Sequence, residues 1–275
     1  MNKIVKLFTM VKNEDDVIED WLNYHGSLFG FTNLYVIDNF SNDNTYKILK
    51  IYQNEKGINL SREGDYRKKG VYMTKLINSC DNYDIAYPID IDEFIVHYDK
   101  ESNKLDPLKV VPYLNSLSYD NTVFKANYVN FVLDKYSKKG FERAAREGKY
   151  GIYCDQGDIA KSFFHKKLWK GIIDHGNHFP KKNYLMTDLV LVHFHCRNYK
   201  QQYDKIVNNV KGLGYNHNSL RELTKLKEKG CAGIHHVTRM IEIIQDKFDI
   251  STDFEYNGQK DIILLDPLTE YVKKL

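Results

Sequence analysis

Over residues 4–89, short apolar segments alternate with segments of helical spacing, and this alternation is the strongest limit on the folds open to the chain. Each apolar segment has the length of a buried strand, and each helical segment follows a polar loop. Strands that alternate with helices predict an α/β fold with a mainly parallel, Rossmann-like sheet flanked by helices. The apolar segments are 4–11, 34–37, 58–60 and 83–89, and the helical segments are 17–25, 41–52 and 72–80.

The second part of the chain contains two further predicted strands and then mostly helices. Residues 121–132 and 189–195 have the pattern of strands, and the charged stretch 134–153 between them predicts a loop with a short helix. We therefore expect one domain over 1–197 and a C-terminal helical segment over 198–275 that packs on it. The expected helices of this segment are 199–211, 219–228 and 234–247, followed by a polar tail.

Charge and cysteine content narrow the classes of protein. The chain has 40 basic and 37 acidic residues, a net charge of +3, so nothing in this balance requires nucleic acid as a partner. The four cysteines are widely scattered, which fits neither a zinc site nor a disulfide scaffold and favours a reducing compartment. The apolar run near Met1 is too short for a signal peptide, and no later run reaches membrane-spanning length. We expect a cytoplasmic protein, with a membrane surface left open as a location.

Two acidic residues follow the last of the apolar segments, in the sequence Asp90-Ile91-Asp92-Glu93. On an extended chain, residues two apart point the same way, so Asp90 and Asp92 would present their carboxylates together. Such oxygens bind Mg²⁺ or Mn²⁺ and leave coordination positions for water and phosphate. Asn13 and Asp38 also stand just past predicted strands, and ligands of such sheets gather at the strands' carboxyl ends. These residues predict a metal-bound diphosphate site, with turn acids as the alternative.

Three segments have an order that resembles the GT-A glycosyltransferases, and among them the family-2-like group with its domain-of-unknown-function 23 and family-92 relatives. They are 9–14, 36–45 and 88–94, and the similarity returns at 160–162 and 193–195. The resemblance implies a GT-A-type fold that holds the nucleoside of a sugar nucleotide on its first two loops and the diphosphate on a metal. By position, the nucleotide would contact Thr9, Val11, Asn13, Asp38, Asp90 and Ile91, and Asp90 and Asp92 would bind the metal.

Basic residues and histidines complete the predicted site. Arg62 and Lys69 lie between the third predicted strand and the next helix, where a cation could meet the diphosphate; solvated surface charge is the alternative. His193 and His195 share one face of a predicted strand, and the resemblance implies a late histidine as a further metal ligand, with His195 ranked before His193. Imidazole suits Mn²⁺ better than Mg²⁺, so we expect Mn²⁺. Histidines that satisfy each other are the alternative.

The predicted reaction needs one more group, a carboxylate that removes the proton from the acceptor hydroxyl. Asp155, Asp158, Asp174 and Glu142 are the candidates, with Asp155 and Asp158 ranked first, because the acceptor is expected beyond the strand at 121–132. Ordinary solvation of a loop is the alternative for each. The predicted protein is a metal-dependent glycosyltransferase. It moves a hexose, with inversion, from a nucleotide donor such as a UDP-sugar to a hydroxyl of a glycan or glycoconjugate.

Three other functions stay open. A sugar nucleotidyltransferase usually has a Gly-rich, basic phosphate loop, which Lys12-Asn13-Glu14-Asp15 does not match. A zinc hydrolase needs closer ligand spacing, such as His-Glu-x-x-His on a helix. A non-catalytic sugar-binding protein would tolerate loss of the two carboxylates. A second copy of the chain and an anionic membrane surface are the further partners considered.

Overall fold

The structure is a computed structural model that describes residues 2–118, 120, 123–132, 140–166, 171–231, 233–248 and 262–275. The chain forms two compact units. The first contains Met1–Phe131, Arg143–His195 and Lys260–Leu275, and the second contains Val132–Glu142 and Cys196–Gln259. The predicted boundary between 1–197 and 198–275 stays a prediction, and residues of the predicted C-terminal segment contribute to both units.

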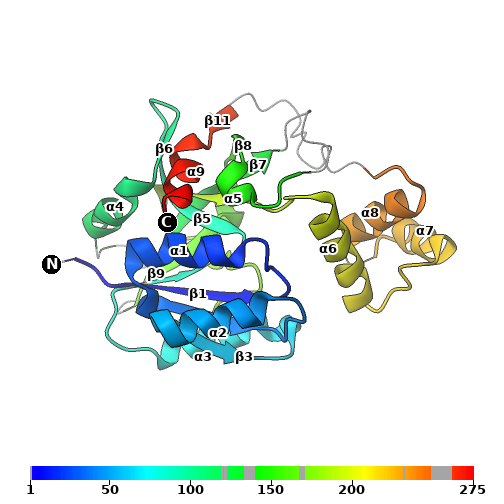
Figure 1. The fold of residues 1–275 in the computed structure, drawn as a ribbon, viewed down its shortest axis with the longest axis horizontal. Coiled ribbons are helices and arrows are strands. Elements are labelled where there is room, and N and C mark those ends of the chain that lie inside the picture. The colour runs from blue at the N-terminus through cyan, green and yellow to red at the C-terminus, as the bar shows by residue number, and fades with distance from the viewer. Residues whose placement is uncertain are drawn as a thin grey trace. The chain divides into compact units, whose positions relative to one another are not determined.

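The first part of the chain builds the parallel half of a sheet, which confirms the predicted α/β class. Strands in the order β3-β2-β1-β4 pair in parallel, with Leu7 opposite Leu34 and Val5 opposite Ile85. Helices connect them, as Figure 1 shows at the blue and cyan end of the chain. The bounds are β1 (Val5–Val11), α1 (Ile18–Phe29), β2 (Leu34–Asp38), α2 (Thr45–Lys56), β3 (Asn59–Arg62), α3 (Lys69–Ser79) and β4 (Ile85–Pro88).

The sheet continues beyond β4 in the order β9-β7-β10-β5-β6. Here β10 runs parallel to β7, and the other pairs along this path are antiparallel. Strand β8 pairs with β7 and with β11. The bounds are β5 (Glu93–Asp99), β6 (Lys104–Asp106), α4 (Val110–Ser116), β7 (Val123–Val132), α5 (Ala144–Glu147), β8 (Tyr150–Cys154), β9 (Lys161–His165), β10 (Leu185–His193), β11 (Ile262–Leu264) and α9 (Asp266–Lys273).

Helices α1 and α3 hold strands β5 and β1 of the sheet in place through buried side chains. Met73 and Ile77 of α3 share a buried cluster with Phe8 of β1. On α1, the fully buried Trp21 and Tyr24 donate hydrogen bonds to backbone carbonyls of β5, from Trp21 Nε1 to Glu93 O at 3.0 Å and from Tyr24 Oη to Ile95 O at 2.6 Å. Because buried ring donors need partners, these bonds fix the start of β5 against α1.

The described residues of the second unit form three helices at the predicted places. They are α6 (Tyr199–Gly212), α7 (Leu220–Glu228) and α8 (Ile234–Ile244), and they pack around a core of their own that includes Val210, Leu223 and Val237. Asn198 and Ser219 cap α6 and α7 by accepting from the backbone N–H groups three residues on. Among the described residues, the helices lack the combination of length and apolar character that crossing a bilayer requires.

Several elements depart from the prediction. The prediction of a polar tail is wrong for residues 262–275. They form β11 and α9, and Leu265, Leu268 and Val272 are fully buried there. Strands β5 and β9 were not predicted, because each follows a polar turn and begins with a charged residue, so no apolar run marks its first residue. The expected loop at 134–153 contains α5 and all but the last residue of β8, and its residues 134–139 lie outside the described part.

Candidate active site

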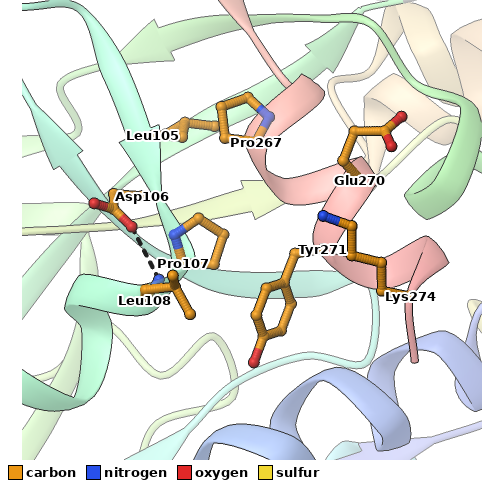
Figure 2. Close-up of a pocket in the computed structure, with 8 residues that line it drawn as sticks. All are labelled: Leu105, Asp106, Pro107, Leu108, Pro267, Glu270, Tyr271 and Lys274. Carbon is orange, nitrogen blue, oxygen red and sulfur yellow. Dashed lines mark hydrogen bonds between the residues drawn. The ribbon is translucent and has the colours of Figure 1, made fainter.

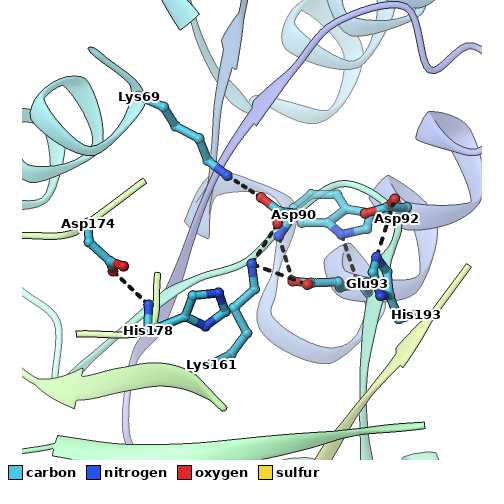
Figure 3. Close-up of polar contacts among 9 residues, drawn as sticks. Lys69, Asp90, Asp92, Glu93, Lys161, Asp174, His178 and His193 are labelled. Carbon is cyan, nitrogen blue, oxygen red and sulfur yellow. Dashed lines mark hydrogen bonds and ion pairs between the residues drawn. The ribbon is translucent and has the colours of Figure 1, made fainter. Parts of the chain in front are cut away.

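Asp90, Ile91 and Asp92 lie in a tight turn between β4 and β5. The Glu93 N–H donates to Asp90 O at 3.2 Å, and Glu93 Oε2 accepts from the Asp90 N–H at 2.8 Å. A turn lacks the two-residue alternation of a strand, so the expected common direction of Asp90 and Asp92 does not occur. Figure 3 shows the two carboxylates directed toward different partners.

Asp92 meets two histidines that are distant in sequence. Its side chain is buried, and its Oδ2 lies 3.5 Å from His193 Nε2. His193 ends β10 directly opposite Glu93 of β5, and the Phe194 N–H donates to Asp92 O at 2.8 Å. One ligand atom from each of Asp92, His193 and His195 lies within 4.8 Å of the others. The sheet pairing of β10 with β5 therefore brings three of the predicted metal ligands together.

The donor set of this group fits a divalent metal. Ligand atoms about 2.1 Å from one ion lie about 3 to 4.3 Å apart in common geometries, so small side-chain shifts would close the sphere. One carboxylate and two imidazoles suit Mn²⁺, Fe²⁺ or Zn²⁺ better than Mg²⁺, which prefers oxygen. The site thus has the chemistry of a transition-metal centre with open positions.

Asp90 contacts two lysines instead. Lys69 forms a short ion pair with its Oδ1, and Lys161 Nζ lies 2.6 Å from its Oδ2 and 3.2 Å from Glu93 Oε1. The lysine side chains are only 3% and 2% exposed, whereas that of Asp90 is 32% exposed. Burial by itself would raise the pKa of Asp90, but the charges of Lys161 and Lys69 outweigh it and hold that pKa below its usual value. Metal binding by Asp90 stays a prediction.

Backbone packing explains why both lysines reach this position. Lys69 is the first residue of α3, and a Cβ on the next residue, Gly70, would lie 2.3 Å from Ile173 O, so glycine allows α3 to approach this segment. Lys161 begins β9, opposite Ala126 of β7. The sequence prediction contained Lys69 but not Lys161. Lys161 lies inside the mostly apolar run 159–164, and a charged residue in such a run was the available signal.

The loops after β1 and β2 are hydrogen-bonded to each other. The Asn13 N–H donates to Ser41 Oγ at 3.0 Å, and Asn13 Oδ1 accepts from the Asn42 N–H at 2.9 Å. Asn13 has a φ of +56°, a left-handed conformation that asparagine tolerates. Thr9 and Val11 precede this loop and are buried in β1. The structure therefore brings Asn13 to the β2 loop and places the other two inside the strand.

Asp38 at the end of β2 is fully buried and already paired. Its Oδ2 accepts from Arg62 Nε at 2.8 Å, and its Oδ1 accepts from the Ser41 N–H at 3.1 Å. The Arg62 guanidinium lies over two rings, 4.5 Å from the centroid of Phe40 and 3.9 Å from that of Tyr46. About a third of the Arg62 side chain and 53% of Phe40 are exposed. This arrangement leaves a flat cationic and aromatic surface at the loop.

Three of the predicted bases have different surroundings. Asp155 and Asp158 are exposed; Asp155 accepts from the Gly157 N–H, and Asp158 accepts from Tyr184 Oη at 2.8 Å. Asp174 is half-buried, and its Oδ1 accepts from the N–H groups of His178 and Phe179. Burial and the charge of Lys161 lower the pKa of His178. They outweigh the charges of Asp174 and Asp90, which raise it. Figure 3 shows Asp174 beside His178, and the Asp174 backbone oxygen lies 3.3 Å from the Cβ position of Gly70, the residue after Lys69.

Two measurable pockets lie elsewhere on the first unit. One of about 370 Å³ lies between the start of η3 (Pro107–Lys109) and α9, and the other, of about 210 Å³, lies beside the N-terminal residues and α4. Figure 2 shows the first, with Leu108 and Tyr271 among its lining side chains. Neither pocket is lined by Asp92, His193 or His195.

Comparison with known proteins gives similarity of structure only. No family model matches the chain, and no curated protein matches it by sequence. Among solved structures, S. aureus TarS 1–349 is similar with 13% identity over 92% of this chain and 73% of that chain, at a TM-score of 0.40. The same fragment in complex with UDP shows 11% identity over 88% and 71%, at 0.42. Glucosyl-3-phosphoglycerate synthase from Mycobacterium tuberculosis, in complex with Mn²⁺, UDP and glucosyl-3-phosphoglycerate, shows 15% identity over 84% and 81%, at 0.40. Sequence identities and TM-scores this low do not assign a function to this chain.

Proposed function

We propose that this protein is a metal-dependent glycosyltransferase that uses a nucleotide-sugar donor, a UDP-sugar first. One observation carries the proposal. Asp92, His193 and His195 form a compact group of metal-ligating atoms, and two buried lysines lie beside it at the same turn. A site that combines a divalent metal with buried ammonium groups suits a diphosphate leaving group.

The protein residues have distinct roles in this proposal. Asp92, His193 and His195 would hold Mn²⁺, which supplies positive charge to the departing diphosphate when bound. The hydrogen bonds of Glu93 with Asp90 and of Phe194 with Asp92 fix the turn before any ligand arrives. Such preorganisation stabilises developing charge without moving the site during the reaction.

The donor nucleoside is proposed to lie on the loops after β1 and β2. Arg62 and the exposed ring of Phe40 offer a stacking surface for a base, and Asn13 offers amide groups to it or to the ribose. Thr9 and Val11 would support these loops from inside β1. Ile91 would contribute at the turn beside the metal group. Asp38 would act through Arg62, because its own oxygens already accept two hydrogen bonds.

Among the predicted bases, Asp174 fits best. Its backbone oxygen lies 3.3 Å from the Cβ position of Gly70, the residue after Lys69, which supports a position near the proposed diphosphate. We assign Asp174 the removal of the acceptor proton, and we keep Asp155 and Asp158 as rivals. An inverting course, a glycan or glycoconjugate hydroxyl as acceptor, and membership in the domain-of-unknown-function 23 and family-92 group belong to the same proposal. The proposal also includes a cytoplasmic location and binding to a second copy of this chain or to a membrane surface.

A hydrolase is the second candidate, because two histidines and one carboxylate also form zinc and iron centres. The two lysines favour the transferase, since they provide positive charge for a diphosphate that a simple hydrolytic site does not need. Metal preference and nucleotide binding separate these functions. A nucleotidyltransferase would require a nucleoside triphosphate, and a sugar-binding protein would respond to the free sugar.

The test is a thermal-shift screen with UDP, GDP, CMP, ATP and free hexoses, each with Mn²⁺, with Zn²⁺ and with no metal. Ligands that bind the native state must raise the melting temperature. We expect UDP with Mn²⁺ to give the largest rise and Zn²⁺ with UDP a smaller one. Stabilisation by a free sugar and by none of the nucleotides, or a response to Zn²⁺ that no nucleotide increases, would remove the proposal.

A further inference from the structure

Asp90 is the exposed member of an otherwise buried charge cluster. Its two oxygens are divided between Lys69 and Lys161, whose side chains are almost fully covered. In Figure 3 the lysines approach Asp90 from different elements, α3 and β9, while Asp92 turns toward His193 on another side. An anion arriving from solvent would therefore meet the ammonium groups where the Asp90 carboxylate now lies.

The cluster needs this carboxylate when no ligand is bound. Two buried ammonium groups are costly without opposite charge, and Glu93 pairs with Lys161 at 3.2 Å. Asp90 supplies the second negative charge and is the partner of Lys69 in the described structure. A diphosphate offers more negative charge and more acceptor oxygens than one carboxylate, and lysine is a flexible donor that can follow a new partner.

The turn itself does not depend on the Asp90 side chain. Glu93 Oε2 accepts from the Asp90 N–H at 2.8 Å, and Trp21 Nε1 donates to Glu93 O at 3.0 Å. The backbone at Asp92 is held separately by the Phe194 N–H. The Asp90 carboxylate can thus rotate away while the backbone and Asp92 keep their positions.

We propose that Asp90 is an exchangeable counter-ion: it covers Lys69 and Lys161 in the ligand-free protein, and the diphosphate of the nucleotide donor takes its place. This inference rests on the proposed function for the identity of the ligand. It gives Asp90 a role different from metal ligation, and it makes the lysine pair a diphosphate site that works without the metal.

The experiment is calorimetric titration of pyrophosphate with EDTA present, so that no divalent ion contributes. Asp90→Asn should bind pyrophosphate about tenfold more tightly than the wild type, because the competing carboxylate charge is gone. The double variant Asp90→Asn with Lys69→Met should lose that gain. Asp106→Asn, which alters an acid at the start of η3, is the matched control and should leave the affinity unchanged. Equal or weaker binding by Asp90→Asn would overturn the proposal.

A second variant keeps the test valid if Asp90→Asn fails to fold. Lys69→Met in the wild-type background leaves Asp90 paired with Lys161, and it should weaken pyrophosphate binding about tenfold. UDP should displace pyrophosphate from the wild type. Unchanged affinity in Lys69→Met, or simultaneous binding of UDP and pyrophosphate, would contradict the exchange. Mn²⁺ titration without phosphate tests the metal group separately, so failure of the proposed function and failure of the exchange give different results.

Discussion

Asp92 Oδ2 lies 3.5 Å from His193 Nε2, although one residue follows β4 and the other ends β10. The contact exists because β10 pairs with β5 in a register that places His193 opposite Glu93. Sheet register is strongly specified wherever a face is buried, so the distance between these two groups is set by the core. A metal site built on this contact would be rigid before metal arrives.

Removal of either imidazole should weaken metal binding. We expect His195→Ala and His193→Ala each to reduce Mn²⁺ affinity by about 100-fold or more, since even outer-shell changes cost 10- to 100-fold at metal sites. Calorimetric titration with Mn²⁺ measures the effect. His217→Ala changes a histidine of the second unit and is the control, which should bind Mn²⁺ like the wild type. If His195→Ala retains wild-type affinity, His195 is not a ligand.

Replacement of Arg62 should destabilise the fold, including the loop after β2 that is proposed to bind the nucleoside. Arg62→Gln leaves the buried Asp38 carboxylate without its cation, and we expect the free energy of unfolding to fall by about 2 to 3 kcal/mol, below the range for fully buried pairs because Arg62 is partly exposed. Urea unfolding checks this. The exposed pair of Arg67 with Asp65 supplies the control, and Arg67→Gln should leave the stability almost unchanged. Equal effects of the two variants would refute the buried pairing.

The buried His25 makes stability depend on pH. Its Nδ1 lies 3.0 Å from Trp21 O and its Nε2 accepts from the Ile95 N–H at 3.4 Å, an arrangement that requires a neutral ring. Burial lowers the pKa of His25 to about 3 from the ordinary value of 6.5. The unfolded chain therefore takes up this proton first, and stability falls as the pH drops from 6.5 toward 3. At pH 5 this group alone removes about 2 kcal/mol.

The measurement for His25 is the loss of unfolding free energy between pH 7 and pH 5 in urea. His25→Phe cannot take up the proton, so its loss should be smaller than that of the wild type by about 2 kcal/mol. It will be less stable at pH 7, because two backbone groups lose their partner. The same loss in both proteins would show that His25 does not titrate as its burial requires.

Asp174→Asn should slow sugar transfer without loss of metal binding. The amide oxygen can still accept from the His178 and Phe179 N–H groups, so the local fold should survive. Loss of a general base typically lowers the turnover rate 10²- to 10⁴-fold. Release of nucleoside diphosphate in the presence of acceptor measures it, with Asp155→Asn and Asp158→Asn as matched comparisons. A larger loss in either of these would transfer the role to that residue.

The parallel half of the sheet could be predicted because its strands are apolar runs and its helices have clear spacing. β1, β2 and α1 follow from local pattern alone. Lys69 was predicted at the site, but the contact of Lys161 with Asp90 could not be predicted, because it depends on the pairing of β9 with β7 and β4, which no local pattern records. The prediction that Asp90 and Asp92 point the same way was wrong, because the Glu93 N–H donates to Asp90 O and the chain forms a turn there.

The histidine group shows the opposite case. His193 and His195 were named from a shared strand face and from the resemblance to GT-A enzymes. The register of β10 with β5 places His193 opposite Glu93, and His195, two residues past the end of β10, lies in the same group as Asp92. The short C-terminal elements β11 and α9 were missed because β11 is defined by its pairing with β8, and α9 by buried side chains such as Leu268 and Val272. Tertiary contacts, rather than propensity, define such short elements.

The central claim is that Asp92, His193 and His195 bind a divalent metal at the turn after β4. The most direct test is calorimetric titration of Mn²⁺ into the wild type, Asp92→Asn, and Asp204→Asn, which changes an exposed acid on α6. We predict one Mn²⁺ per wild-type chain, the same binding in Asp204→Asn, and binding lost in a still folded Asp92→Asn. Wild-type stoichiometry and affinity in Asp92→Asn would contradict the account.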